Sequence, residues 1–300
     1  MSDHDFTSIR LPVLAQQFEG EQRDFMIDLL SAMTENFKRG LGMNTDFYLE
    51  VAKGNVPGHS AVNKFGHNPA VDTSGEDLWA GGGTYGFWPT SGVSIDIKSS
   101  AAADGVAGTG ALTCVVYGLD GDWKEQTSEV ITLNGLTEVA IAGTWMRIFR
   151  LVVLTAGTYG TNVGNLTVQC VGAGGGLLDN TIGIYVAADD GQTQQAIYTI
   201  PAGKTGFFIK GYVGLADDDK NGETAGFKWK ARPNNGTSGA WAVKGQISLV
   251  SIGSGHWQYA YGIPAGPLPE KTDIKLEVYE TTAILGVVGG FDILLVDHGF

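Results

Sequence analysis

From residue 94 onward the sequence is a succession of short apolar runs separated by glycine-rich turns. This pattern constrains the fold more than any other feature. The runs are rich in β-branched and aromatic residues and have the length of single strands. The first of them lie at 94–98, 111–119, 128–133, 137–142, 145–154 and 164–172. The chain holds 45 glycines against 9 prolines, without a collagen repeat, which is typical of many tight turns. A mainly β fold is therefore predicted.

A polar, turn-rich stretch at 187–194 interrupts the series of strand-like runs, as linkers between compact units do. We therefore expect two antiparallel β-sandwich lobes of jelly-roll type. The first is expected at 94–190 and the second at 191–300. The two cysteines, Cys114 and Cys170, lie inside strand-like runs, where a thiol acts as a small buried hydrophobe.

Residues 1–45 carry the strongest helical pattern of the chain. Apolar side chains recur at helical spacing between residues 17 and 39, and Lys38 and Arg39 lie near the end, where they favour the helix dipole. The apolar face consists of Phe18, Phe25, Met26, Leu29, Leu30, Met33 and Phe37. We expect an arm with an amphipathic helix ahead of the β lobes. The helix either covers its own lobe or docks on a neighbouring subunit, and the pattern leaves both open.

Residues 46–93 form a segment rich in aromatic residues and glycine, with few runs of strand length. Such a segment is expected to wrap across a protein surface and bury its rings there. The side chains expected to take part are His59, Phe65, His67, Trp79, Tyr85 and Trp88.

The charge balance disfavours a nucleic-acid partner. The formal net charge is −13, from 32 acidic and 19 basic residues, and a surface of that sign repels phosphate backbones. The N-terminus lacks the pattern of a signal peptide, and the longest apolar runs are too short for a membrane helix. We expect synthesis in a cytoplasm and no membrane anchor.

The sequence offers no strong catalytic, cofactor or metal motif, so none is predicted. His59 and His67 lie near several carboxylates, but their spacing matches no standard metal site. Acidic clusters such as 217–219 lie in turns, where we expect solvent-exposed carboxylates. The alternative is a Ca²⁺ site formed by such a loop. Trp257 and Tyr259 are candidates for stacking on a glycan or for anchoring a partner.

A longer set of motifs gives a resemblance to a known family. It begins with GHSAVNKFGHNP at 58–69, VDT at 71–73 and LWAGGGTY at 78–85. It continues with GTGA at 108–111, GTYGTNVG at 157–164, GQTQQA at 191–196 and YTIPAGKT at 198–205. These segments resemble virion structural proteins of tailed bacteriophages, over about residues 46–212. The resemblance implies a non-catalytic, multi-copy protein without a cofactor.

Three functions compete on these grounds. The first is a head decoration or cement protein that docks on the major capsid protein, as a homo-oligomer, with a trimer expected. The second is a neck, tail or baseplate fibre or attachment protein that binds a cell-surface glycan through the C-terminal lobe. The third is a glycan-degrading enzyme with Asp217 or Asp218 as the carboxylate. The first is the main prediction, and the expected location is the virion.

Overall fold

A computed structural model describes residues 29, 47–215, 222–234, 239–250 and 256–299, with only the backbone described for 256–264. The chain divides into two compact units, residues 1–57 and 58–300. In the first unit, α3 (Phe47–Ala52) is a short helix with Val51 buried. The predicted docking helix lies outside the described residues except for Leu29, which is helical and exposed. No helix in the described part of the chain is long and apolar enough to cross a membrane.

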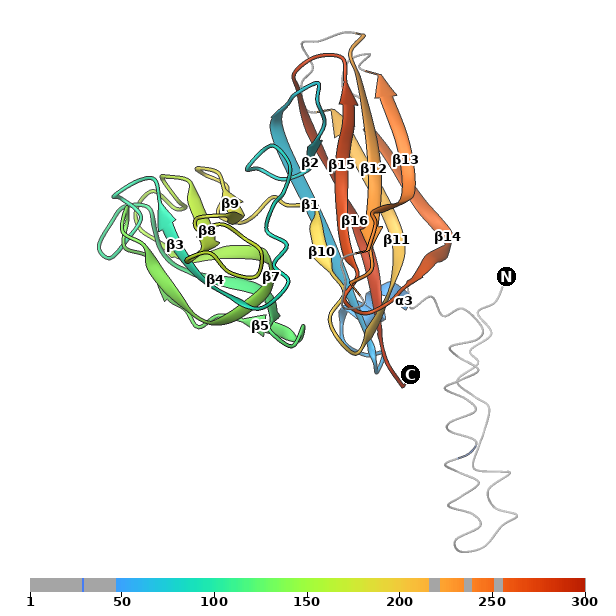
Figure 1. Ribbon diagram of the computed structural model, residues 1–300, viewed down its shortest axis with the longest axis horizontal. Helices are drawn as coiled ribbons and strands as arrows, with labels where there is room; N and C mark the ends of the chain where they lie inside the picture. Colours follow the sequence, from blue (N-terminus) through green and yellow to red (C-terminus); the bar gives the residue numbers. More distant parts are fainter. Residues whose placement is uncertain (1–28, 30–46, 216–221, 235–238, 251–255, 300) are drawn as a thin grey trace, which may run out of the picture. The chain divides into compact units, whose positions relative to one another are not determined.

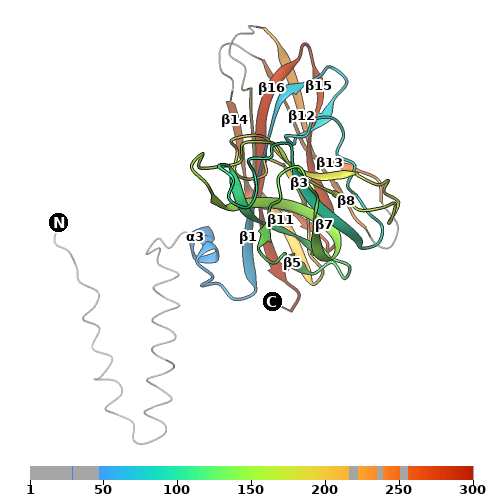
Figure 2. The same cartoon turned by 90° about the vertical axis from the view of Figure 1, so that its left-hand side faces the viewer.

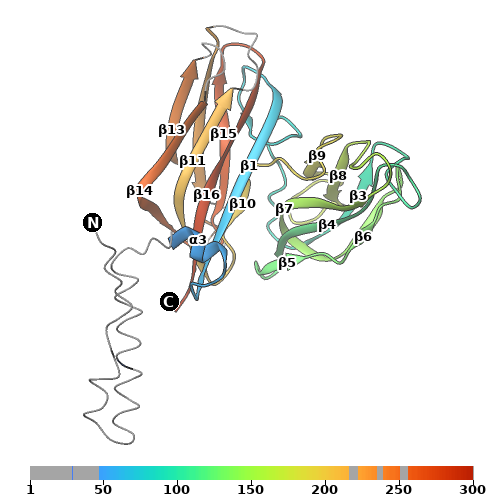
Figure 3. The ribbon, with the colours of Figure 1, turned by 180° about the vertical axis from the view of Figure 1, so that it is seen from behind.

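The second unit contains a sandwich of two antiparallel sheets (Figure 1). One sheet has the order β1 (His59–Val71), β16 (Leu285–Asp297), β11 (Lys204–Leu215) and β14 (His256–Leu268). The other has the order β10 (Ile197–Thr199), β15 (Asp273–Thr281), β12 (Thr224–Arg232) and β13 (Ala242–Val250), and β2 (Glu76–Asp77) also pairs with β15. Figure 3 shows the first sheet from its outer side. We call this sandwich the jelly-roll lobe.

The strand order of this lobe is that of an eight-stranded jelly roll, provided that β2 and β10 count as one strand. Numbered along the chain, the sheets then read 1-8-3-6 and 2-7-4-5. β2 and β10 pair with successive parts of β15: Asp77 lies opposite Glu277, and Ile197 lies opposite Lys275. The second strand of the jelly roll is therefore interrupted and then resumed.

The interruption occurs between Leu78 and Ala196. The Leu78 N–H donates to the carbonyl of Leu276 (2.8 Å), and the Leu276 N–H donates to the carbonyl of Ala196 (3.1 Å). The Ala196 N–H donates to the carbonyl of Leu78 (2.9 Å), so the two ends of the interruption are hydrogen-bonded to each other. The intervening residues 79–195 leave and re-enter at one point, and we call them the inserted lobe.

The inserted lobe is one seven-stranded antiparallel sheet (Figure 2). Its strands are β3 (Val93–Ser99), β4 (Ala111–Asp120), β5 (Glu125–Thr127), β6 (Ile131–Thr132), β7 (Val139–Ala156), β8 (Leu166–Cys170) and β9 (Ile182–Val186). β7 pairs with β3 over its first part and with β4 over its second part, so it belongs to both halves of the sheet. Buried side chains from both halves, including Trp145, Ile95 and Ile184, form one core.

Each lobe has its own hydrophobic core. In the jelly-roll lobe, Phe227, Phe291 and Leu276 are fully buried between the two sheets. Burial of side chains of this size stabilises a fold by about 1.5 to 3 kcal/mol each relative to exposure. In the inserted lobe, Cys114 and Cys170 are free and fully buried, as expected for small hydrophobes.

The mainly β fold with antiparallel sandwich lobes is confirmed, whereas the predicted division of the chain differs from the structure. Residues 46–93 were expected to be irregular, yet β1 is a 13-residue strand within them. β1 and β2 complete the C-terminal sandwich, so residues 46–93 supply two of its strands. The runs at 137–142 and 145–154 form the single long strand β7.

Candidate functional site at the junction of the lobes

The two lobes are joined by a buried ion pair between Arg147 of β7 and Asp273 of β15. The Arg147 Nε donates to Asp273 Oδ1 (2.8 Å) and its Nη2 donates to Oδ2 (3.0 Å), which is the two-pronged geometry that a guanidinium makes with a carboxylate. The Arg147 side chain is 4% exposed and that of Asp273 is 0% exposed. Water therefore screens this pair little.

Asp273 also accepts three hydrogen bonds from its own lobe. The donors are Arg232 Nη2 (2.8 Å), Asn234 Nδ2 (2.7 Å) and Thr199 Oγ1 (2.7 Å). With both carboxylate oxygens fully occupied, the desolvation cost of the buried charge is offset by charge-assisted hydrogen bonds. The Asp273 carboxylate therefore binds donors from both lobes and links them.

Three tryptophan rings enclose the two guanidinium groups at this junction. Arg147 lies 4.6 Å from the centroid of Trp123 and 5.3 Å from that of Trp88. Arg232 lies 5.1 Å from Trp88 and 4.6 Å from Trp241. Trp88 thus contacts a cation from each lobe, and each such contact adds roughly 0.5 to 2 kcal/mol.

Trp123 adds a backbone link between the lobes. Its carbonyl accepts a hydrogen bond from the Ala202 N–H (2.9 Å), while its ring lies over Arg147. Its φ is +65°, a left-handed conformation that is costly for a bulky residue. The two contacts together hold Trp123 in this conformation.

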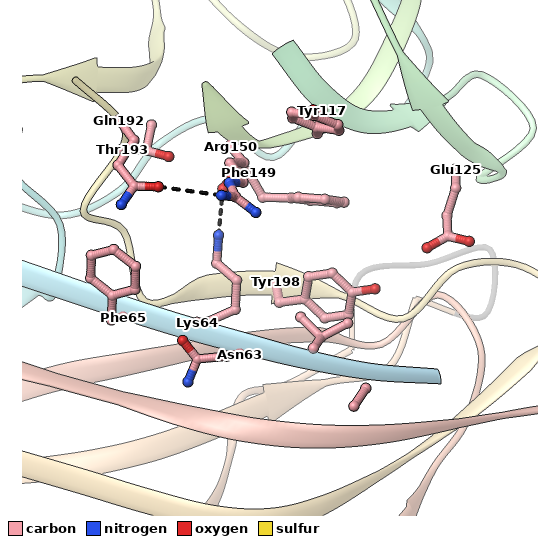
Figure 4. Close-up of a pocket in the computed structure, with 12 residues that line it drawn as sticks. Asn63, Lys64, Phe65, Tyr117, Glu125, Phe149, Arg150, Gln192, Thr193 and Tyr198 are labelled. Atoms are coloured by element: carbon pink, nitrogen blue, oxygen red, sulfur yellow. Dashed lines mark hydrogen bonds between the residues drawn. The ribbon is translucent and has the colours of Figure 1, made fainter. Parts of the chain in front are cut away.

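A cavity of about 400 Å³ separates β1 from the inserted lobe (Figure 4). β1 provides Asn63, Lys64 and Phe65, and the resumed strand β10 provides Tyr198. The inserted lobe provides Tyr117, Glu125, Phe149, Arg150, Gln192 and Thr193. With the apolar side chains of Ala61 and Val62, the wall therefore combines aromatic rings, amide and hydroxyl groups, two cations and one carboxylate.

Lys64 is the unusual residue of this cavity. Its side chain extends from β1 toward the inserted lobe, and its Nζ donates to the carbonyl of Phe149 (Figure 4). The residue is 8% exposed, and no salt bridge joins it to a carboxylate of the described residues. Burial, and next the charge of Arg150, lower the pKa of Lys64 to about 7.

The structure places the predicted wrapping residues in two groups. Trp79, Tyr85 and Trp88 pack edge to face in one row, with ring centroids 5.3 and 5.0 Å apart. Trp79 and Tyr85 belong to the core of the inserted lobe, and Trp88 reaches the ion pair. The remaining three, His59, Phe65 and His67, are half-buried residues of β1, and Phe65 lines the cavity.

The other predicted residues are not brought to this junction by any described contact. Trp257 and Tyr259 belong to β14, where their backbones lie opposite Val213 and Gly211. Asp217 and Asp218 lie outside the described residues. Within the described ranges, no group of three or more His, Cys, Asp or Glu side chains is placed to hold a metal ion.

Sequence reasoning did not identify Lys64, Arg147 or Asp273. Arg147 carried only a partial signal, because it is one of two charges, with Arg150, among the apolar residues of the strand-like run 145–154. The structure buries Arg147 and leaves Arg150 exposed, and only the buried charge has to find a partner. Asp273 and Lys64 lie in segments of mixed polarity that carry no comparable signal.

No family model matches this chain, and no curated protein matches it. Similar solved structures include the T13 IBDV viral particle, at 12% identity and a TM-score of 0.24, over 80% of this chain and 69% of that chain. They also include infectious bursal disease virus Gt strain, at 13% identity and a TM-score of 0.24, over 84% of this chain and 78% of that one. Likeness at this level carries no argument about fold or function.

Proposed function

We propose that this protein is a non-enzymatic structural component of a virus particle. The observation that carries the proposal is a jelly-roll lobe with a second β lobe inserted into one of its strands and fixed there by the Arg147–Asp273 pair. Jelly rolls recur in viral capsid and lectin domains. Two chain crossings and a buried ion pair connect the two lobes, which suits a part repeated in a lattice.

Three of the buried carboxylates support a structural role. Asp273 is occupied by five donors, as described above. Asp104 accepts hydrogen bonds from Ser99, Ala111, Val163 and Gly164 and so ties three loops together. Glu76 accepts from Asn68, Asp72 and Gly83. These carboxylates stabilise the fold, and their oxygens already accept hydrogen bonds from groups of the protein itself.

The particle we propose is that of a tailed bacteriophage, on the family resemblance of residues 46–212. The position we propose is the outer face of the head, where the protein decorates the capsid lattice through residues 1–45. An outer position fits the net charge of −13, because the interior is lined by packaged nucleic acid. The partners are the major capsid protein and further copies of this chain.

The test is quantitative mass spectrometry of purified particles together with rebinding of the purified protein. A decoration protein is expected in fixed ratio to the major capsid subunit, and the full chain should rebind to particles that lack it. A chain without residues 1–45 should stay folded and fail to rebind. Absence of the protein from purified particles would overturn the proposal.

A second candidate function is attachment to a host surface at the neck, tail or baseplate. The cavity between β1 and the inserted lobe favours it, because decoration alone needs no concave polar site. An attachment protein would be present in a few copies at one vertex, and antibodies against it would block adsorption. Copy number therefore separates the two positions.

A further inference from the structure

We propose that the cavity between β1 and the inserted lobe is a binding site for a sugar that carries a carboxylate. Lys64 and Arg150 would hold the carboxylate, and the aromatic and amide groups of the wall would hold the ring. The inference deepens the second candidate function, since it names the ligand class of the same cavity, and binding to the isolated protein tests it apart from the position of the protein on a particle.

The first support is the positive charge inside an acidic protein. Lys64 and Arg150 both line the cavity, and no salt bridge to a carboxylate joins either of them within the described residues. Lys64 uses one donor on the carbonyl of Phe149, so its ammonium group retains two further donors. A buried cation without a counter-charge is costly, and a bound anion would relieve that cost.

The second support is that Arg150 is positioned while most of its donors remain available. Its Nη2 donates to Gln192 Oε1 (3.3 Å), and its guanidinium lies 5.8 Å from the centroid of Tyr117. These contacts hold the group at the wall of the cavity, and a guanidinium matches a carboxylate with two parallel hydrogen bonds. A carboxylate is therefore the anion that the site fits best.

The third support is the remainder of the wall. The Tyr198 ring is held by Phe149, with centroids 4.9 Å apart, and Phe65 offers a second aromatic surface. Gln192 and Thr193 supply amide and hydroxyl groups that can meet sugar hydroxyls. Rings beside hydrogen-bonding groups suit a sugar, whose ring has apolar faces and a polar edge.

The volume of the cavity and the negative charge of Glu125 in its lining limit which anionic ligands can bind. A cavity of about 400 Å³ is within the range of small-molecule sites and suits a compact ring. Glu125 lies in the lining with a side chain that is 56% exposed, and its salt bridge to Lys204 is long at 3.8 Å. This negative charge disfavours polyanions such as nucleic acid, and favours a ligand with one charge.

The test is titration of the full chain with matched sugars. Glucuronate, galacturonate and N-acetylneuraminate are compared with glucose and galactose by calorimetry and by saturation-transfer NMR. At least one acidic sugar is expected to bind about tenfold or more tightly than the neutral sugars, a difference of about 1.4 kcal/mol. The inference is overturned if no acidic sugar exceeds the neutral ones. It is also overturned if acetate, inorganic phosphate or a glutamate-rich peptide binds more tightly than every acidic sugar.

Variants locate the site. Lys64→Met and Arg150→Gln are each expected to weaken binding by about tenfold or more, because each removes one charged contact. Lys124→Gln, which removes an exposed lysine outside the cavity, is the matched control and should bind normally. Because Arg150 is exposed, its variant should fold even if the Lys64 variant does not. Normal binding by Arg150→Gln would place the ligand elsewhere and overturn the assignment.

Proton uptake gives an independent readout. The pKa of Lys64 is about 7 in the free protein, so at pH 8 most of its amino groups are neutral. A bound carboxylate favours the charged form, and binding should therefore take up a proton. Calorimetry at pH 8 in buffers of different ionisation enthalpy measures this uptake, which Lys64→Met should abolish. A wild-type protein that binds without uptake would exclude Lys64 from the site.

Discussion

Arg147 and Asp273 are 126 residues apart in sequence and form a two-pronged, fully buried ion pair between the lobes. The pair lies on strands that belong to different lobes, β7 and β15. Its geometry ties the orientation of the inserted lobe to the register of the jelly roll, because both oxygens of one carboxylate are engaged at once.

Loss of either partner of this pair should destabilise the protein strongly. Asp273→Asn and Arg147→Met are each expected to lower the free energy of unfolding by about 3 to 5 kcal/mol, because the remaining charge stays buried without its partner. Arg147→Lys should recover only part of this, since an ammonium group cannot make the two-pronged contact. Urea unfolding measures the change.

The exposed pair between Lys98 and Glu138 is the matched control for that experiment. Its side chains are 37% and 48% exposed at a distance of 2.8 Å. Lys98→Gln should change stability by less than about 1 kcal/mol, because solvent screens the interaction. Equal losses in the free energy of unfolding at both pairs would contradict the conclusion that burial makes the Asp273 pair important.

Lys64 should make stability depend on pH between about 7 and 10. Its pKa falls from 10.5 to about 7 on folding, so in this window the unfolded chain binds more protons than the native one. The free energy of unfolding should rise with pH through the window, by up to about 1.4 kcal/mol per unit, and the cost is fully present below pH 7.

Lys64→Met should remove this rise and stabilise the protein at pH 7, by about 1 to 3 kcal/mol, because an apolar chain of similar length replaces a buried charge. Lys124→Met is the control and should keep the pH dependence of the wild type. Denaturant unfolding at a series of pH values provides the measurement. A flat wild-type profile would mean that Lys64 stays charged in the fold.

The inserted lobe should be removable when the strand register is kept. Leu78 and Ile197 lie opposite consecutive residues of β15, so joining them directly restores one continuous strand. The shortened chain is expected to fold as a β-sandwich that unfolds cooperatively, with a lower Tm because the junction is lost. Circular dichroism and thermal unfolding test this.

A join to Tyr198 instead of Ile197 is the matched control for the deletion. It shifts the register by one residue and turns each following side chain to the opposite face of the sheet. This variant should fail to unfold cooperatively. Equivalent behaviour of both joins would contradict the assignment of β2 and β10 to one strand.

Gly66 is required where β1 passes over the point of insertion. A Cβ at this position would lie 2.5 Å from the Leu78 carbonyl oxygen and 2.8 Å from the Ala196 nitrogen. Gly66→Ala should therefore cost about 1 to 3 kcal/mol, since the backbone on both sides must move. Gly86→Ala is the control, because its Cβ would meet its nearest atom, of Thr181, at 3.9 Å. Thermal unfolding compares the two.

The mainly β fold could be predicted because strands are marked in the sequence by residue types that lie close together. Runs such as 111–119 carry β-branched residues between glycine turns, and β4 occupies nearly the same residues. β1 could not be predicted in this way, because its sequence includes Gly66, Asn68 and Pro69, which have low strand propensity. Pairing of β1 with β16 along its length, by hydrogen bonds to a distant segment, overrides that propensity.

The sequence by itself determined that the chain is mainly β, that its thiols are buried and that its charge is acidic, because each of these properties depends on residue type and close spacing. Only the tertiary structure decided that Leu78 and Ala196 meet, that Arg147 reaches Asp273 and that Lys64 is buried beneath the inserted lobe. These contacts join residues about 80 or more positions apart. Their formation depends on strand order and register, which are set by the packing of whole sheets and by no local pattern.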